Sequence, residues 1–245
     1  MAGIHIADDP NISARLRRFL RARSRRGPRT TASAIRSALP AGDLADAMVR
    51  FEERYGGLTY PVLGGNNMEY GLDGPPSVHA TPLGPAFHGI LDGDWTWGLS
   101  VLADGRTAMG AGRWPFRVID RSVDQRLERH ALMVEVRGWC HRTFECRTPA
   151  HVPPVIDESV LPPPVPEASG PAEWWWCSGD VAVQATLRGW PPGRDRWTIR
   201  YFARTPLQAA EANPTIYAAT VHETVPEVLC TLCHRPIEPG RTCTR

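Results

Sequence analysis

The stretch from 39 to 72, LPAGDLADAMVRFEERYGGLTYPVLGGNNMEYGL, restricts the fold of this chain more than any other part of it. Apolar residues recur on one side of its first half, at Leu44, Met48, Phe51 and Tyr55. This spacing is typical of an amphipathic α-helix. Gly56 and Gly57 follow, where a left-handed helix end favours residues without a Cβ atom. Apolar residues then alternate from 58 to 62, so we expect a helix that leads into a strand through a glycine corner.

Later patterns predict further strands and a second helix in the same domain. Residues 95–101 alternate between apolar and small or polar side chains, which indicates a half-buried strand. Asp104-Gly105 favours a hairpin turn, and Ser122 with Gln125 has the spacing of a capping box. The helix that follows has an apolar face made of Val123, Leu127, Ala131 and Val134. This order predicts an α+β fold, with packed helices on a mixed or antiparallel sheet.

These residues resemble the SUKH superfamily, which includes bacterial toxin-immunity proteins and related fungal cell-wall regulators. The resemblance begins with Leu-Pro at 39–40, an acidic helix that ends in Phe-x-x-x-Tyr-Gly-Gly, and Tyr-Pro at 60–61. It continues through WTWGLSVLADGRTAMG and SVDQRLERHALMVEV and covers roughly residues 36–136. The resemblance implies a SUKH-like domain, which we place at 37–147, and a function in binding and silencing a cognate toxin.

All 28 basic residues of the chain are arginine, and the absence of lysine excludes several catalytic mechanisms. A P-loop lysine, a kinase-type lysine, a Schiff base and a Ser-Lys pair all require that residue. The motifs G-x-S-x-G, H-E-x-x-H and G-x-G-x-x-G are also missing from the sequence. Cys140 and His141 could form a thiol nucleophile, but sequence neighbours rarely share a catalytic geometry, and a packed cysteine is the alternative. We therefore favour a binding protein over an enzyme.

The net charge of +2 hides an uneven distribution of charge along the chain. Residues 1–36 form an Arg-rich segment of formal charge +7, so the rest of the chain carries −5. Residues 11–26 have the pattern of an amphipathic helix. The eight arginines between Arg15 and Arg29 could contact phosphates or an acidic surface. The alternative is a solvated helix or a frayed terminus, and Phe19 alone offers little support for base stacking.

Proline marks the end of the first predicted domain. Eight prolines occur among the 24 residues from Thr148 to Pro171. This density is incompatible with regular helix or sheet and favours extended backbone. We therefore expect a Pro-rich linker, or a strap across the first domain, at 148–172.

A small ββα module is predicted at 173–219. After the tryptophans of 174–176, residues 181–187 and 197–201 alternate as two strands would. Thr205 and Gln208 have the spacing of a capping box, with proline at the first helical position. We expect the helix to end at Asn213-Pro214, because proline disrupts a helix interior.

The C-terminal residues 220–245 contain the sharpest motif, with Cys230, Cys233 and His234 followed by Cys243. A Cys-x-x-Cys turn directs two thiolates at one tetrahedral ion, and the Pro-Gly corner at 239–240 could return the third cysteine. This predicts a zinc knuckle, and a reduced-thiol tail is the alternative. The fourth ligand is open among His234, His222, Cys140, His141, Cys146 and Cys177. Haem attachment would require export, and a thioredoxin-like site would require a βαβ unit.

We expect a cytoplasmic protein, because the sequence has neither a run of ~18 apolar residues nor the apolar core of a signal peptide. Our first functional hypothesis is a non-enzymatic immunity protein that neutralises a cognate bacterial toxin by direct binding. The −5 charge of residues 37–245 would favour a basic toxin. The alternative is a regulatory nucleic-acid-associated protein that uses the Arg-rich N-terminus and the zinc knuckle. An enzyme with an unrecognised site is the third hypothesis.

Overall fold

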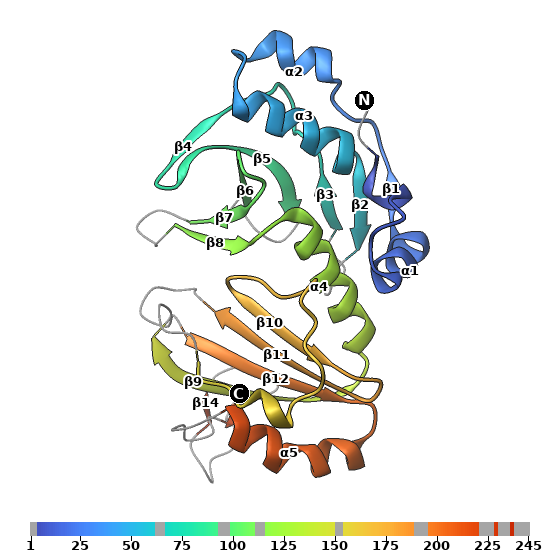
Figure 1. Cartoon of the computed structure of the whole chain (residues 1–245), viewed down its shortest axis with the longest axis vertical. Helices are drawn as coiled ribbons and strands as arrows, with labels where there is room; N and C mark the ends of the chain where they lie inside the picture. The colour runs from blue at the N-terminus through green and yellow to red at the C-terminus, as the bar shows by residue number, and fades with distance from the viewer. Residues whose placement is uncertain are drawn as a thin grey trace. The chain divides into compact units, whose positions relative to one another are not determined.

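The structure is a computed structural model, shown in Figure 1. It describes residues 4–61, 67–92, 99–110, 116–149, 154–188, 196–220, 228–229 and 236–237. The chain divides into two compact units, Met1–Glu135 with Pro166–Ala172, and Val136–Val165 with Glu173–Arg245. Both units contain helices and antiparallel strands, so the predicted α+β class is confirmed. None of the helices in the described ranges has the length and apolar character needed to cross a membrane.

The first unit contains most of the helical residues. Its helical elements are η1 (Ile6–Asp8), α1 (Ala14–Arg23), α2 (Ala32–Ala38), α3 (Asp43–Tyr55) and α4 (Val123–Val136). Ser13 caps α1 by accepting the N–H of Leu16, and Thr31 caps α2 by accepting the N–H of Ala34. These hydroxyls satisfy backbone donors that a first helical turn leaves unpaired.

One antiparallel sheet runs through the first unit. Its strands are β1 (Arg25–Arg26), β2 (Leu58–Pro61), β3 (Asn67–Tyr70), β4 (His79–Thr81), β5 (Gly84–Asp92), β6 (Leu99–Leu102), β7 (Thr107–Met109) and β8 (Arg117–Asp120). The order is β1-β2-β3-β5-β6-β7-β8, and β4 pairs with β5. The predicted turn at Asp104-Gly105 connects β6 to β7, and Gly105 has a φ of 85° that favours glycine there.

The apolar face of α3 packs on this sheet, as the sequence pattern predicts (Figure 1). Met48 is fully buried, and the Phe51 ring meets the Phe87 ring of β5 edge-on, with 5.4 Å between the centroids. Val101 of β6 belongs to the same core. The first half of the predicted strand at 95–101 lies outside the described residues.

The glycine corner after α3 brings three backbone segments together. Gly57 has a φ of 75°, and its carbonyl accepts the N–H of Gly27 at 2.7 Å. A Cβ atom on Gly57 would lie 2.3 Å from the Gly27 carbonyl oxygen, so no side chain fits. The buried carboxylate of Glu52 accepts the N–H groups of Thr30 and Leu72, at 3.0 and 2.5 Å. This corner therefore joins α3 and the sheet to the N-terminal segment.

The N-terminal residues are part of the core of the first unit. Leu16, Phe19 and Leu20 of α1 and Ile35 of α2 are buried in the same cluster as the apolar face of α3. Helix α1 ends at Arg23 because the next residues form β1, which pairs with β2. The structure therefore contradicts the alternative of a solvated helix or frayed terminus, and the segment 1–36 does not stand apart from the first domain.

The second unit is built on a four-stranded antiparallel sheet of order β10-β11-β12-β9. Its strands are β9 (Cys140–Pro149), β10 (Glu173–Cys177), β11 (Val181–Arg188) and β12 (Arg196–Ala203). One face packs against α5 (Pro206–Thr220), as Figure 1 shows. The two central strands and the capping box of Thr205 and Gln208 match the sequence pattern.

The structure adds a strand to the predicted ββα module, and the expected end of its helix was wrong. The tryptophans at 174–176 lie within β10, because they alternate between its two faces and Trp176 packs in the core. Helix α5 continues through Pro214 to Thr220, because Ile216 and Ala219 are buried against the sheet. Tertiary packing thus offsets the cost of about 3 kcal/mol that proline brings to a helix interior.

The Pro-rich stretch does not behave as one linker. Strand β9 extends to Pro149, which is tolerated because β9 is an edge strand that pairs only with β12. The short helix η2 (Glu158–Val160) follows within the second unit. Residues Pro166–Ala172 belong to the first unit. The predicted boundaries at 147 and 172 therefore differ from the division in the structure.

We expect Phe19→Ala to lower the free energy of unfolding by about 3–4 kcal/mol, because it would leave a cavity in the core. Phe19 is buried and meets the Tyr60 ring edge-on at 5.0 Å. Chemical denaturation followed by circular dichroism would measure the change. Arg18→Ala, on the exposed side of the same helix, is the control and should change stability by at most ~0.5 kcal/mol. Equal effects of the two substitutions would contradict a packed α1.

Candidate functional site

The predicted zinc ligands Cys230, Cys233, His234 and Cys243 lie outside the described residues. The residues on either side of the Cys-x-x-Cys segment are described. Strands β13 (Val228–Leu229) and β14 (Pro236–Ile237) pair antiparallel. The segment with the first two cysteines and His234 therefore connects two paired strands. Among the described residues, no group of three or more metal-binding side chains is present.

The more distant candidate ligands are spread over the second sheet. Cys140 and His141 lie in β9 and Cys177 lies in β10, which are the two edges of the sheet. Three strand spacings of ~4.8 Å separate these edges, far too much for one ion. Cys140 packs with the core, and the ring centroid of His141 lies 6.1 Å from that of Phe202 on the opposite face. A thiol–imidazole pair is therefore not assembled here. The side chain of Cys146 lies outside the described set.

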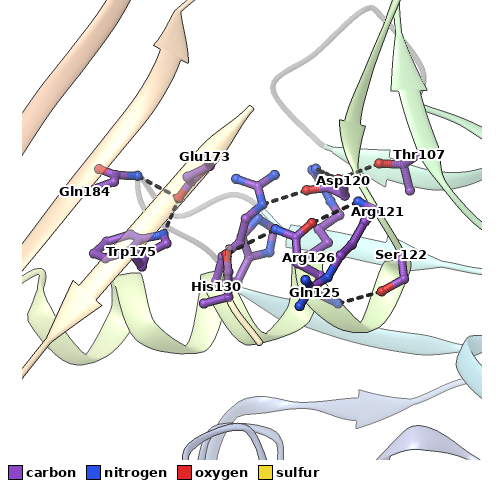
Figure 2. A network of polar contacts seen from close by, with 12 residues as sticks. Thr107, Asp120, Arg121, Ser122, Gln125, Arg126, His130, Glu173, Trp175 and Gln184 are labelled. Atoms are coloured by element: carbon purple, nitrogen blue, oxygen red, sulfur yellow. Dashed lines mark hydrogen bonds and ion pairs between the residues drawn. The ribbon is translucent and has the colours of Figure 1, made fainter. Parts of the chain in front are cut away.

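A buried charge cluster joins α4 to the sheet of the first unit (Figure 2). Asp120 at the end of β8 is fully buried and accepts a hydrogen bond of 2.5 Å from the Thr107 hydroxyl. Its two oxygens also lie 3.2 Å from Arg126 Nη1 and 2.9 Å from Arg129 Nε. Burial alone would raise the pKa of Asp120, but the two guanidinium groups and the Thr107 hydroxyl hold that pKa below its ordinary value. The carboxylate therefore stays charged and anchors α4.

A second group of polar side chains ties α4 to β2 and β3. The Tyr60 hydroxyl lies 2.7 Å from that of Tyr70 and 2.8 Å from His130 Nδ1. Burial and the neighbouring Tyr70 raise the pKa of Tyr60 well above its ordinary value. Burial, together with Arg129 and Arg126, lowers the pKa of His130 well below its own. All three groups are neutral at pH 7, which suits a hydrogen-bonded support between elements.

Gln125 holds the Pro-rich strap against α4. Its N–H donates to the Ser122 hydroxyl at 3.1 Å, as the capping box predicts, and its side-chain oxygen accepts the N–H of Arg121 (Figure 2). Its amide nitrogen donates to the Ala168 carbonyl at 3.1 Å. A Cβ atom on Gly170 would lie 2.3 Å from the Gln125 side-chain oxygen. Glycine at 170 therefore permits the close approach of the strap.

A comparable polar cluster lies inside the second unit (Figure 2). The buried carboxylate of Glu173 accepts hydrogen bonds from Trp175 Nε1 at 2.6 Å and from Gln184 Nε2 at 2.7 Å. These contacts connect β10 to β11. The sequence analysis missed Glu52, Asp120 and Glu173, because a charged residue gives no pattern that reveals its buried partners. Glu52 alone had a signal, one helical turn after Met48 at the edge of the apolar face of α3.

The structure divides the eight arginines of the N-terminal segment into two sets. Four are engaged within the first unit: Arg15 with Glu135 and Glu167, Arg17 with the carbonyls of Pro10 and Ile12, Arg26 with Asp8, and Arg29 with the carbonyl of Glu53. The side chains of the other four are exposed and form no ion pair or hydrogen bond within the described part of the chain: Arg18, Arg21, Arg23 and Arg25.

The sheet of the first unit has a face opposite the helices that we call the outer face. Residues paired across neighbouring antiparallel strands share a face, so Thr59, Glu69 and Leu91 form one row on it. Glu69 is exposed and Leu91 is 38% exposed. Val78 precedes β4 and Leu83 lies in the turn between β4 and β5, and both side chains are exposed. Apolar and acidic side chains are therefore exposed close together, and Glu69 forms no ion pair with the described residues.

Two histidines stack on the outer face beside this hairpin. The rings of His79 and His88 are nearly parallel, with 4.1 Å between their centroids. His79 Nε2 lies 2.9 Å from the buried Ser100 hydroxyl. Burial and the neighbouring His88 ring lower the pKa of His79 below its ordinary value. The hydroxyl lies beneath the ring at 2% exposure, so the pair positions the hairpin and does not present a nucleophile.

We expect Asp120→Asn to lower the free energy of unfolding by about 3–5 kcal/mol at pH 7, because two guanidinium groups would lose their buried carboxylate. Since the pKa of Asp120 is depressed in the folded state, its contribution is present above the unfolded pKa of ~3.9 and is lost as pH falls through the folded pKa. The difference between variant and wild type should therefore shrink below about pH 4.

Denaturation curves between pH 3 and 7 would measure this pH dependence. Asp46→Asn is the matched control, since Asp46 is 57% exposed and lies 3.8 Å from Arg36. Asp46→Asn should lower the free energy of unfolding by no more than ~0.5 kcal/mol at any pH, because exposed ion pairs contribute little to stability. A constant difference between Asp120→Asn and wild type across this range would contradict the anchoring role.

Comparison with known proteins adds no assignment for either unit. No family model, curated protein or solved structure matches the chain. A function must therefore be inferred from the residues and surfaces described above.

Proposed function

We propose that this chain is a non-enzymatic binding protein of the immunity type, which neutralises a cognate bacterial toxin in the cytoplasm by direct binding. The SUKH-like sequence pattern supports this proposal. So does the order of elements in the first unit, where α3 leads through Gly56 and Gly57 into an antiparallel sheet that α4 follows. The buried polar clusters act as supports between elements, which suits a rigid scaffold for a binding surface.

The observation that carries the proposal is the outer face with its hairpin. Val78, Leu83 and Leu91 are 45%, 41% and 38% exposed; Val78 and Leu83 flank β4, which pairs with β5, the strand that carries Leu91. Exposed apolar groups of this kind supply the centre of protein–protein interfaces. Glu69 and Asp73 are exposed and have no ion pair within the described residues. Acidic groups beside an apolar centre favour a basic toxin surface and speed association with it.

The experiment compares two matched triple variants in cells that express a candidate toxin domain chosen from the genes that neighbour this one. Val78→Asp, Leu83→Asp and Leu91→Asp together should abolish growth rescue and weaken binding at least about 100-fold, because interface anchors each cost more than ~1 kcal/mol. Val155→Asp, Val160→Asp and Leu207→Asp change apolar residues of the second unit that are 77%, 46% and 68% exposed. This control should retain rescue. Thermal unfolding would establish that both variants fold.

Two exposed acidic residues of the first unit give a second readout of this experiment. Glu69→Arg with Asp73→Arg should slow association with the toxin domain and leave dissociation nearly unchanged, because exposed charges act mainly on encounter. If growth rescue survives the triple variant of the first unit but is lost with the triple variant of the second unit, the toxin is recognised by the second unit. A wild-type chain that neither rescues growth nor binds the neighbouring toxin would overturn the proposed function.

We further propose that the C-terminal residues hold zinc through Cys230, Cys233 and Cys243, with His234 as the fourth ligand. The pairing of β13 with β14 supports this proposal, because the Cys-x-x-Cys segment then connects two antiparallel strands as in a zinc ribbon. Protein purified without chelator should contain about one zinc ion per chain by elemental analysis.

The zinc content of two single variants tests this ligand set. Cys233→Ser should lose the metal, since it removes a proposed ligand. Cys177→Ser should keep it, because Cys177 lies at an edge of the second sheet, away from this segment in sequence. If the wild-type protein contains no metal and its stability does not change with chelator, the zinc proposal is wrong and the C-terminal cysteines are reduced thiols.

A further inference from the structure

The exposed arginines of the N-terminal segment are held in fixed positions. Leu16, Phe19 and Leu20 bury one side of α1 in the core, so Arg18 and Arg21 project from the other side, one helical turn apart. Arg23 ends the helix and Arg25 lies in β1, whose pairing with β2 fixes it. The four residues form what we call the arginine surface. Its backbone is ordered before any ligand arrives, which lowers the entropic cost of binding.

A hollow of about 620 Å³ lies next to the end of α1. This volume is within the range of ligand-binding clefts, ~300–1,000 Å³. Arg23, Arg25, Thr59 and Asn67 line it, and no acidic residue is among its lining residues. None of these four side chains forms a hydrogen bond within the described residues. The hollow therefore presents hydrogen-bond donors and two positive charges that are not used by the fold.

A second hollow, of about 690 Å³, lies on the other side of Ser24 and has a different character. Arg21 lines it together with Asp8 and Asp9, and those carboxylates already pair with Arg26 and Arg54. The acid-free hollow is therefore the stronger anion site. Arg18 and Arg21 do not line the acid-free hollow and add positive charge on the neighbouring side of α1. On the sheet, the positive surface ends at Glu69, which lies two strands away from Arg25.

The composition of the arginine surface distinguishes between two kinds of anionic partner. The exposed side chains of α1 are arginine and alanine, and α1 exposes no large apolar side chain. Protein interfaces place apolar or aromatic anchors at their centre, whereas nucleic-acid interfaces are polar and strongly positive. No exposed aromatic ring is available in α1 to stack on a base. These features favour contact with phosphates of a duplex over contact with an acidic protein.

We propose that the arginine surface binds the phosphate backbone of duplex nucleic acid without reading its sequence. Arginine suits this role because its planar guanidinium binds a phosphate through two parallel hydrogen bonds. From Arg18 to Arg23 the helix rises about 7.5 Å at 1.5 Å per residue, close to the span of three successive phosphates at ~3.4 Å along one strand, and Arg25 of β1 adds a fourth position. Three or four phosphates are therefore within its reach. This activity is separate from the proposed neutralisation of a toxin.

Fluorescence anisotropy of the full chain with a labelled 20-base-pair DNA duplex tests the proposal. Four neutralised phosphates give a slope of about −3.6 for log affinity against log salt, so affinity should fall roughly 10²-fold between 50 and 200 mM salt. Replacing Arg18, Arg21, Arg23 and Arg25 with glutamine should remove most of this slope and weaken binding at least tenfold at about 50 mM salt. The four substitutions with lysine should retain part of the affinity, since the charge remains without the planar fork.

The control removes the same charge elsewhere. Arg36, Arg50, Arg106 and Arg142 are exposed, and their replacement with glutamine should leave DNA binding within about twofold. Equal loss in both sets would overturn the proposal, because net charge alone would then explain binding. A wild type that does not bind DNA at low salt would also overturn it. So would polyglutamate that binds the arginine surface more tightly than DNA, since the partner would then be an acidic protein.

Discussion

The close backbone contact at Gly56 and Gly57 is the constraint on which the first unit depends. Gly27 donates its N–H to the Gly57 carbonyl, and Gly57 donates its own N–H to the Tyr70 carbonyl at 2.8 Å. Three segments far apart in sequence thus meet at a distance that excludes a Cβ atom. The carboxylate of Glu52 reinforces the corner by accepting two backbone N–H groups. Burial raises the pKa of Glu52, although both hydrogen bonds and Arg29 favour its charged form. The entry of α1 into the core and the start of the sheet both follow from this contact.

The uneven charge of the chain has a structural cause. The N-terminal arginines face an acidic remainder of the chain, and Arg15 lies 3.0 Å from Glu135 and 3.4 Å from Glu167. Arg54 joins Asp9 of the N-terminal segment to Asp124 of α4, at 2.9 and 2.6 Å. Part of the uneven charge distribution is therefore used in ion pairs that hold the N-terminal segment against the rest of the first unit. Removing residues 1–36 would open the core, so such a deletion cannot separate the functions of the two ends.

Two proposed surfaces share the same scaffold and differ in chemistry. The outer face combines Leu91 and the hairpin residues with Glu69, which suits a protein partner with basic groups. The arginine surface offers guanidinium groups without apolar anchors, which suits phosphates. Buried charges such as Asp120 hold the elements between them. Because the residues of both surfaces are exposed, the outer face and the arginine surface can each be altered by substitution without loss of the fold.

Local elements whose patterns repeat over short distances can be predicted from the sequence. The apolar spacing of α3, the Asp104-Gly105 turn and the two capping boxes each depend on residues within one helical turn or one hairpin, so their geometry is written locally. The outer face could be anticipated only as the second side of a half-buried sheet. Its exposed residues could not, because exposure depends on strand order and register.

Which arginines are engaged depends on contacts between distant segments. Arg15 and Arg18 are equivalent in the sequence pattern, but only Arg15 lies close to Glu135 and Glu167 in the structure. The tertiary structure also placed β9 and β10 at the edges of one sheet and carried α5 through Pro214. In each case contacts between distant residues outweighed a local preference. A buried apolar side chain is worth about 1.5–3 kcal/mol, which is as large as most local penalties.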